Sequence, residues 1–284
     1  MTATPAAPGT GVAGREGPTG PARARTERSA LRSVAVPTEH GGWGLTLEPV
    51  LLGLLVAPSV AGVLLGLAAM LAFLARTPTK VVLVDRWRGR RLARTVLARR
   101  VAVVEIGVIT GLLAGAALLS PGRIWWPALA VAPLVATELW FDMRSRSRRL
   151  VPELAGAVGI SAVATMIALA GDADASVAVG LWAVLSARAI AAIPVVRGQV
   201  ARLHGRRADP RLSVAAQGVA LAVAALAVVA DLRLVAGAVA VGAVVAYHAA
   251  TARRPIPRAV VLGMRQLVLG LAVVVVTAVG VLLG

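Results

Sequence analysis

The chain has 284 residues, of which 58% are apolar and 15% are charged, whereas about 25% of an ordinary soluble domain is charged. The apolar residues form long runs of Ala, Val and Leu, as a hydrocarbon core of about 30 Å requires. The net charge of +17 is typical of nucleic-acid binding. The arginines, however, lie between apolar runs, so we attribute them to membrane orientation and expect no nucleic-acid partner. The absence of Cys excludes disulfides, thiolate catalysis and Cys-ligated metals.

The first 35 residues are polar and basic and lack apolar periodicity, so we expect a disordered tail that is no secretory signal peptide. Nine apolar runs follow, and they predict an all-α domain over residues 36–284. The expected transmembrane helices are 44–57, 60–75, 101–119, 124–141, 154–170, 176–195, 212–229, 232–250 and 259–283.

Basic residues alternate between the connections. The N-terminal segment and the connections after helices two, four, six and eight hold 26 of the 30 Lys and Arg residues. The connections of the other side are short and hold only Arg123 and Arg233. By the positive-inside rule, this alternation predicts a cytoplasmic N-terminus and an external C-terminus. The abundance of Ala and Arg is typical of a high-GC bacterial genome, so we expect a bacterial plasma membrane.

The connection after helix two is rich in arginine. Residues 77–100 resemble a basic amphipathic helix, which would lie in the interface beside anionic headgroups. The alternative is a solvated positive-inside helix that binds no ligand.

The stretch 37–44 lies where the polar tail meets the first apolar run. Glu39 and His40 are adjacent there, and an ionisable pair at the edge of a bilayer is a candidate site. We predict acid–base catalysis by these two residues and a substrate contact by Trp43. The alternative is wetted interface residues beside a belt tryptophan.

Two carboxylates lie at the cytoplasmic end of helix four. Glu138 and Asp142 are four residues apart and share one helix face. With Asp85 they are the candidate ligands of Mg²⁺, which takes carboxylates together with phosphate oxygens, and Asp142 is also a candidate catalytic group. The alternative is that each carboxylate pairs with a nearby arginine.

Three cations are candidate phosphate ligands. Arg188 lies more than two turns before Arg197, roughly 13 Å deeper in the membrane. An arginine at that depth needs a partner or a polar cavity, and arginine binds phosphate well. We predict that Lys80, Arg188 and Arg197 hold an anion. The alternative for Arg188 is an ion pair with a neighbouring helix, or snorkelling.

The residues from Pro37 to Gly44, with Glu48 and Pro49 after them, resemble the YwiC-like family of bacterial membrane proteins. The stretches 141–156 and 188–197 are similar to later parts of that family, whose biochemical function is not settled.

The predicted topology also resembles, more distantly, the UbiA superfamily of membrane prenyltransferases. That resemblance implies a prenyl diphosphate held through Mg²⁺ by aspartate-rich motifs after helices two and six. This chain has only Asp85 at the first position and no carboxylate before Asp209 at the second. An enzyme of this kind would therefore be a transferase with degenerate motifs, in which Glu39 and His40 replace the missing carboxylates.

Together, these candidate carboxylates and cations favour a membrane protein that binds an isoprenoid or other phosphorylated ligand in a cytoplasm-facing cavity. Two other hypotheses stay open. One is a transporter of a small anion, and the other is a non-catalytic scaffold or assembly factor whose basic loops bind a partner or anionic lipid.

Overall fold

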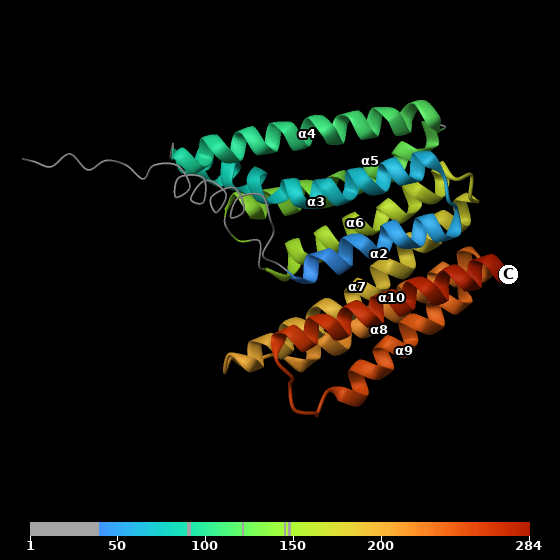
Figure 1. Cartoon of the computed structure of the whole chain (residues 1–284). Helices are drawn as coiled ribbons and strands as arrows, with labels where there is room; N and C mark the ends of the chain where they lie inside the picture. The colour runs from blue at the N-terminus through green and yellow to red at the C-terminus, as the bar shows by residue number, and fades with distance from the viewer. Residues whose placement is uncertain (1–39, 90–91, 121, 145, 147–148) are drawn as a thin grey trace, which may run out of the picture.

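The computed structural model describes residues 40–89, 92–120, 122–144, 146 and 149–284 (Figure 1). The described residues form nine α-helices and two short 3₁₀ helices, which confirms the all-α prediction. The predicted tail 1–35 and Glu39 lie outside the described residues. The elements are α2 (His40–Val56), α3 (Val60–Trp87), α4 (Ala93–Leu119), η1 (Gly122–Trp125), α5 (Trp126–Met143), α6 (Leu150–Ala170), α7 (Ala175–Leu203), α8 (Pro210–Ala230), η2 (Leu232–Leu234), α9 (Val235–Thr251) and α10 (Ala259–Leu283).

Successive helices run in opposite directions, so the connections gather at two ends of the bundle (Figure 1). We call the end with the connections 88–92, 144–149, 204–209 and 252–258 the basic end, and the other the opposite end. Helices α6 and α7 are the most buried and form the centre. Helix α2 packs against α3 and α6 on one side and against α10 and α7 on the other. We call α2–α6 the first half of the bundle and α7–α10 the second half. Helix α2 therefore joins the two halves.

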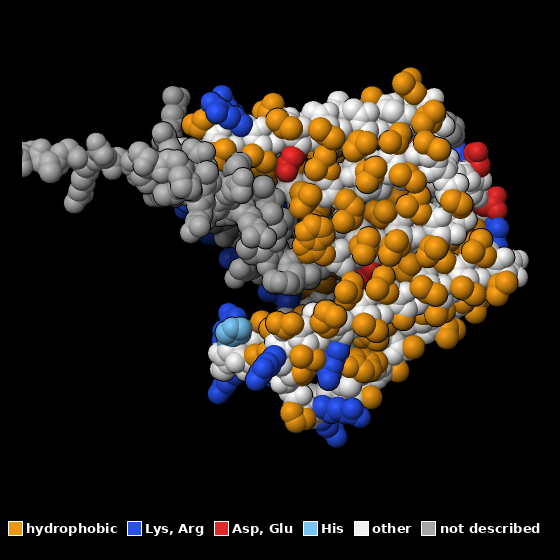
Figure 2. Space-filling view, viewed as in Figure 1, with side chains coloured by type: hydrophobic (Ala, Val, Ile, Leu, Met, Phe, Trp, Pro, Cys, Tyr) orange, Lys and Arg blue, Asp and Glu red, His pale blue; other side chains and the backbone are white. Residues whose placement is uncertain are grey.

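Eight helical segments of the described chain are long and apolar enough to cross a membrane. The apolar part of α2, residues 42–56, is shorter. Apolar side chains cover the visible flank of the bundle, and Lys and Arg side chains gather at its basic end (Figure 2). The protein is a multi-pass membrane protein.

The prediction of a separate interfacial helix over residues 77–100 is wrong. Helix α3 continues through Pro78 to Trp87, and α4 already begins at Ala93. The chain reverses at Gly89, whose φ of 63° is a conformation that glycine adopts without strain. Lys80, Arg86, Arg94, Arg99 and Arg100 therefore lie within two membrane helices, because arginine is a good helix former and a proline within a membrane helix is tolerated.

Glycines let the central helices approach closely. A Cβ atom at Gly53 of α2 would lie 2.7 Å from Ile167 Cβ and 3.0 Å from the backbone oxygen of Ala164, both in α6. A Cβ at Gly66 of α3 would lie 2.7 Å from Val50 Cγ1 of α2. Small residues allow this close packing in a membrane, where van der Waals contact drives helix association.

At the opposite end of the bundle, Arg233 forms ion pairs with two aspartates of the second half. The Arg233 guanidinium lies 2.7 Å from Asp174 Oδ2 and 2.8 Å from Asp231 Oδ2, and Ser176 Oγ donates to Asp231 over 2.8 Å. The hydrogen bond from Arg233 holds the pKa of the Asp231 carboxyl well below its usual range. These contacts connect η2 to the beginning of α7.

The contact between α2 and α6 gives a test of this packing. Gly53→Ala should lower the free energy of unfolding by about 1–3 kcal/mol, because overpacking forces the helices apart. The matched control is Gly107→Ala in α4, where a Cβ would meet nothing within 4 Å and the alanine raises helix propensity. Unfolding in detergent measures both. Equal stability of the two variants would contradict the close contact.

Candidate functional site

Helix α2 places Glu48 inside the bundle. A Cβ at Gly42 would lie 2.5 Å from the Phe73 ring of α3, and one at Gly44 would lie 3.4 Å from Leu267 Cδ1 of α10. Gly42 therefore lets α2 approach α3 closely, whereas a Cβ at Gly44 would make only an ordinary contact with α10. Pro49 lies within α2 and removes one backbone hydrogen bond of the helix. Glu48 is only 2% exposed.

Glu48 forms an ion pair with Arg188 of α7. Arg188 Nη2 lies 3.0 Å from Glu48 Oε1, and the two side chains are 4% and 3% exposed. The same nitrogen donates to the backbone oxygen of Gln266 in α10 over 2.5 Å. One guanidinium thus contacts both α2 and α10. Such burial is costly for a lone charge and acceptable for a neutralised pair.

Gly270 leaves the space that this ion pair occupies. A Cβ on Gly270 of α10 would overlap the carboxyl group of Glu48 and lie 2.6 Å from Arg188 Nη2. A larger residue at this position would therefore displace the pair. The site is built by three helices, and α10 contributes both the space at Gly270 and the Gln266 backbone oxygen.

Several polar atoms around the ion pair lack hydrogen-bond partners among the described residues. They are Glu48 Oε1, Arg188 Nε, His248 Nδ1 and Gln266 Oε1. Glu48 Oε1 is close enough to Arg188 for an ion pair, but the geometry does not direct an N–H at it. Gln266 Nε2 lies 3.1 Å from His248 Nε2, which brings α9 into the cluster. We call Glu48, Arg188, Gln266 and His248 the buried polar cluster.

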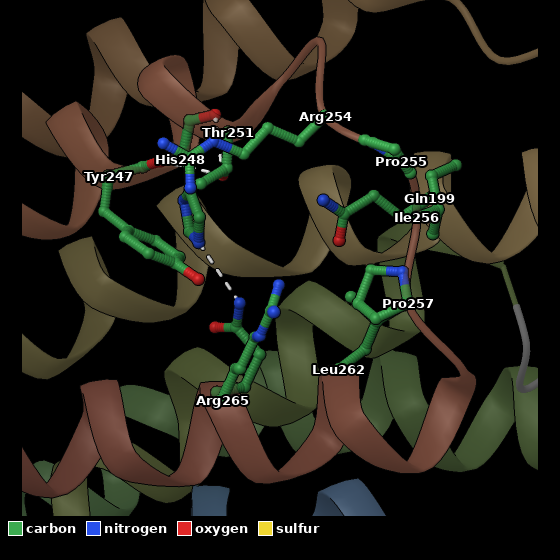
Figure 3. Close-up of a pocket in the computed structure, with 11 residues that line it drawn as sticks. Gln199, Tyr247, His248, Thr251, Arg254, Pro255, Ile256, Pro257, Leu262 and Arg265 are labelled. Atoms are coloured by element: carbon green, nitrogen blue, oxygen red, sulfur yellow. Dashed lines mark hydrogen bonds between the residues drawn. The ribbon is translucent and has the colours of Figure 1, made fainter.

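A pocket at the basic end borders this cluster (Figure 3). Its lining comes from α7, α9, α10 and the connection between the last two: Gln199, Tyr247, His248, Thr251, Arg254, Pro255, Ile256, Pro257, Leu262, Arg265 and Gln266. Arg265 extends from α10 towards α9, and Arg254 runs back from the connection towards Thr251 (Figure 3). His248 and Gln266 belong to both the pocket and the buried polar cluster. The pocket is therefore continuous with the polar interior.

The structure brings Glu138 and Asp142 to two cations of α3. Arg76 Nη2 lies 2.8 Å from Glu138 Oε1, and Arg76 Nε lies 3.1 Å from Asp142 Oδ2. Lys80 Nζ lies 3.3 Å from Asp142 Oδ1. A Cβ at Gly156 of α6 would lie 2.7 Å from Glu138 Oε1. These pairs hold α3, α5 and α6 together at the basic end, and the partners are more distant in sequence than the arginines after Asp142.

Asp85 and Arg197 occupy two other places. Asp85 is 1% exposed and accepts from Arg94 over 3.2 Å and from Thr95 Oγ1 over 2.6 Å. Arg197 Nη1 lies 2.7 Å from Glu153 Oε2. Within the described ranges, no group of three or more His, Asp or Glu residues is placed to hold a metal ion. The predicted Mg²⁺ ligation by Asp85, Glu138 and Asp142 stays a prediction.

The residues of the stretch 37–44 are described in part. The Trp43 ring packs edge-on against Phe73, with 5.1 Å between the ring centroids. Glu39 and the side chain of His40 lie outside the described residues. The catalytic role of that pair and the substrate contact of Trp43 therefore stay predictions.

The sequence interpretation did not assign Glu48, His248, Gln266, Arg254 or Arg265 to a site. A signal existed for the first three, because polar residues within apolar runs mark polar interiors. The two arginines lie near a helix end, where positive charge is expected for topology alone. Only the folded arrangement of α7, α9 and α10 brings them to one pocket.

The ion pair can be tested by a double-mutant cycle. Glu48→Gln should lower the free energy of unfolding by about 3–5 kcal/mol, because it leaves a buried guanidinium without its counter-charge. Adding Arg188→Met removes that charge and should recover much of the loss. The readout is unfolding in mixed detergent micelles. Additive losses in the double variant would contradict direct pairing.

Part of the chain is similar to a known protein family. Residues 36–168 match the family model described as YwiC-like protein, and no curated protein and no solved structure matches the chain. The matched range contains Glu48, Glu138 and Asp142 and ends before Arg188. The ion pair therefore joins the matched part to the part beyond it. The match confirms the resemblance read from the stretch 37–49, and over residues 36–168 this membrane protein is similar to the YwiC-like family.

Proposed function

We propose that the protein binds the phosphate or diphosphate head of a membrane amphiphile, such as an isoprenoid diphosphate, in the pocket at the basic end. The observation that carries this proposal is the position of Arg254 and Arg265 on the pocket wall. Neither forms an ion pair with a carboxylate of the described residues. Guanidinium groups bind phosphate oxygens by two parallel hydrogen bonds.

This proposal moves the anion contact away from the cations expected from the sequence. Lys80, Arg188 and Arg197 each contact a carboxylate, and an incoming phosphate would have to compete with that partner. Arg254 and Arg265 face no such competition from the described residues. Net positive charge at the pocket therefore supports anion binding there.

Neutral donors and an apolar flank support the same ligand class. Gln199 and Tyr247 lie in the pocket wall and offer an amide and a phenolic hydroxyl to phosphate oxygens. On α10, Val261 and Met264 are 40% and 57% exposed, which suits contact with a hydrocarbon chain. The head would lie in the pocket and the chain along α10. The proposal concerns binding, and catalysis by Glu39 and His40 is a further step that it does not require.

The proposed orientation places the basic end in the cytoplasm of a bacterial cell, by the positive-inside rule. Alkaline phosphatase fused after Gly284 should then be active, because that enzyme needs an oxidising compartment. A fusion after Gly205, in the connection 204–209, should be inactive. The reverse pattern of activities would overturn the orientation.

Arg254→Gln with Arg265→Gln should weaken binding of an isoprenoid diphosphate by at least about tenfold, since a hydrogen bond to a charged group contributes about 1.5–3 kcal/mol. The full chain in neutral-lipid nanodiscs is titrated with a farnesyl diphosphate probe. Arg253→Gln with Arg258→Gln is the matched control, because it removes two charges beside the pocket. An equal loss in the control would show general attraction to charge and contradict the pocket.

A further inference from the structure

We propose that Glu48 is a proton-binding site inside the membrane domain, hydrated from the basic end through His248 and Gln266. The inference concerns the buried polar cluster and does not depend on which anion, if any, occupies the pocket. It assigns a ligand, water with an exchangeable proton, to polar atoms that the packing leaves without partners.

The cluster forms a continuous polar path across four helices. His248 lies in the pocket wall, three residues before the end of α9 and thus about 5 Å from it. Its Nε2 lies 3.1 Å from Gln266 Nε2, and the Gln266 backbone oxygen accepts from Arg188. Arg188 in turn contacts Glu48 at 3.0 Å. Each step joins a different helix, so the path leads from the pocket into the centre of the bundle.

The orphaned atoms suit water better than a fixed ion. Glu48 Oε1 and Gln266 Oε1 are acceptors, and Arg188 Nε is a donor, and all three lack a partner among the described residues. His248 Nδ1 serves either role, depending on its tautomer. Water both donates and accepts, and it satisfies buried polar groups of mixed kind. An anion would meet the Glu48 carboxylate, and a cation would meet the Arg188 guanidinium.

The polar path ends at the Glu48 carboxyl group. With Glu48 ionised, the pair with Arg188 is neutral. Protonation leaves one net positive charge between α2, α7 and α10, where the Gln266 backbone oxygen still accepts from Arg188. The ion pair would then be broken, and the contact between α2 and α7 would weaken. Proton uptake is thereby connected to the joint between the two halves of the bundle.

Among the other charged and titratable groups on the described residues near α2, none forms an ion pair or hydrogen bond with Glu48. Those on the described residues of the helices packed against α2 are Arg76, Lys80, Asp85 and Arg86 on α3, Glu153 on α6, Arg197 and Arg202 on α7, and Arg265 on α10. The acids among them contact basic residues. Arg188 is therefore the charged group that acts directly on the protonation state of Glu48.

Among the described residues, the polar path opens at the basic end, where His248 and Gln266 line the pocket. Towards the opposite end, three buried hydroxyls bond to backbone oxygens: Thr277 to Val273, Ser161 to Ala157 and Thr165 to Ala178. The buried Ser186 Oγ, two residues before Arg188, has no hydrogen-bond partner among the described residues. The donors of Thr277, Ser161 and Thr165 are thus occupied, and the ionisable side chains beyond them, such as Asp174, Asp231 and Arg233, pair with one another at the opposite end. A proton would enter and leave by the basic end, which distinguishes this site from a through-going channel.

Hydration can be tested with single cysteines, because the chain has none of its own. His248→Cys and Gln266→Cys should react with a water-soluble methanethiosulfonate reagent at least tenfold faster than Ala249→Cys and Val268→Cys. The two controls lie at nearly the same depth on the same helices and are exposed on the outer surface of the bundle. The full chain in nanodiscs is used. Rates equal to the controls would overturn the hydrated path.

Protonation can be tested on the unaltered protein with dicyclohexylcarbodiimide, a hydrophobic reagent that modifies protonated carboxyl groups. Glu48 should be modified increasingly as the pH falls from 9 to 5, as peptide mass mapping would show. Gln266→Leu should suppress this modification and leave that of Glu105, a carboxyl in α4 outside the cluster, unchanged. If Glu48 is unmodified at every pH while Glu105 reacts, the pair is permanently ionised and the proposal fails.

Discussion

An arginine inside a membrane protein needs a counter-charge, because the free energy of an unpaired buried charge is high. In this chain the counter-charge of Arg188 is Glu48. The requirement fixes α2 against α7, and the bond from Arg188 to the Gln266 backbone brings in α10. Gly270 must stay small for the pair to fit. The ion pair thus adds one electrostatic constraint to the packing that joins the two halves of the bundle.

The basic end follows a second rule, that most of its carboxylates are neutralised by cations from neighbouring helices. Arg76 and Lys80 meet the acids of α5, and Arg197 meets Glu153 of α6. These contacts hold helices together and leave fewer cations for ligands. Arg254 and Arg265 are placed differently, since they face a pocket. The distinction separates arginines that stabilise the bundle from those available to an anion.

Much of the fold follows from the sequence, since apolar runs of membrane length and alternating basic connections are properties of the chain alone. The need of Arg188 for a partner also follows, from its depth. Its choice of Glu48 does not, because 140 positions separate them and only tertiary packing shows which helices meet. The stretch 77–100 was misjudged because its basic residues suit an interfacial helix and a helix extension equally. The pocket was missed because arginines near helix ends, such as Arg254 and Arg265, are expected for topology alone.

The account rests on the direct contact between Glu48 and Arg188 in lipid. Solid-state NMR can measure it by dipolar recoupling between Glu 13Cδ and Arg 15Nη in the full chain, with Glu48→Gln to assign the signal. We expect a strong coupling at the Glu48 carboxyl carbon, in accord with an oxygen–nitrogen distance of 3.0 Å. A Glu48 carboxyl without coupling to any arginine would contradict the account, because Arg188 would then need another partner.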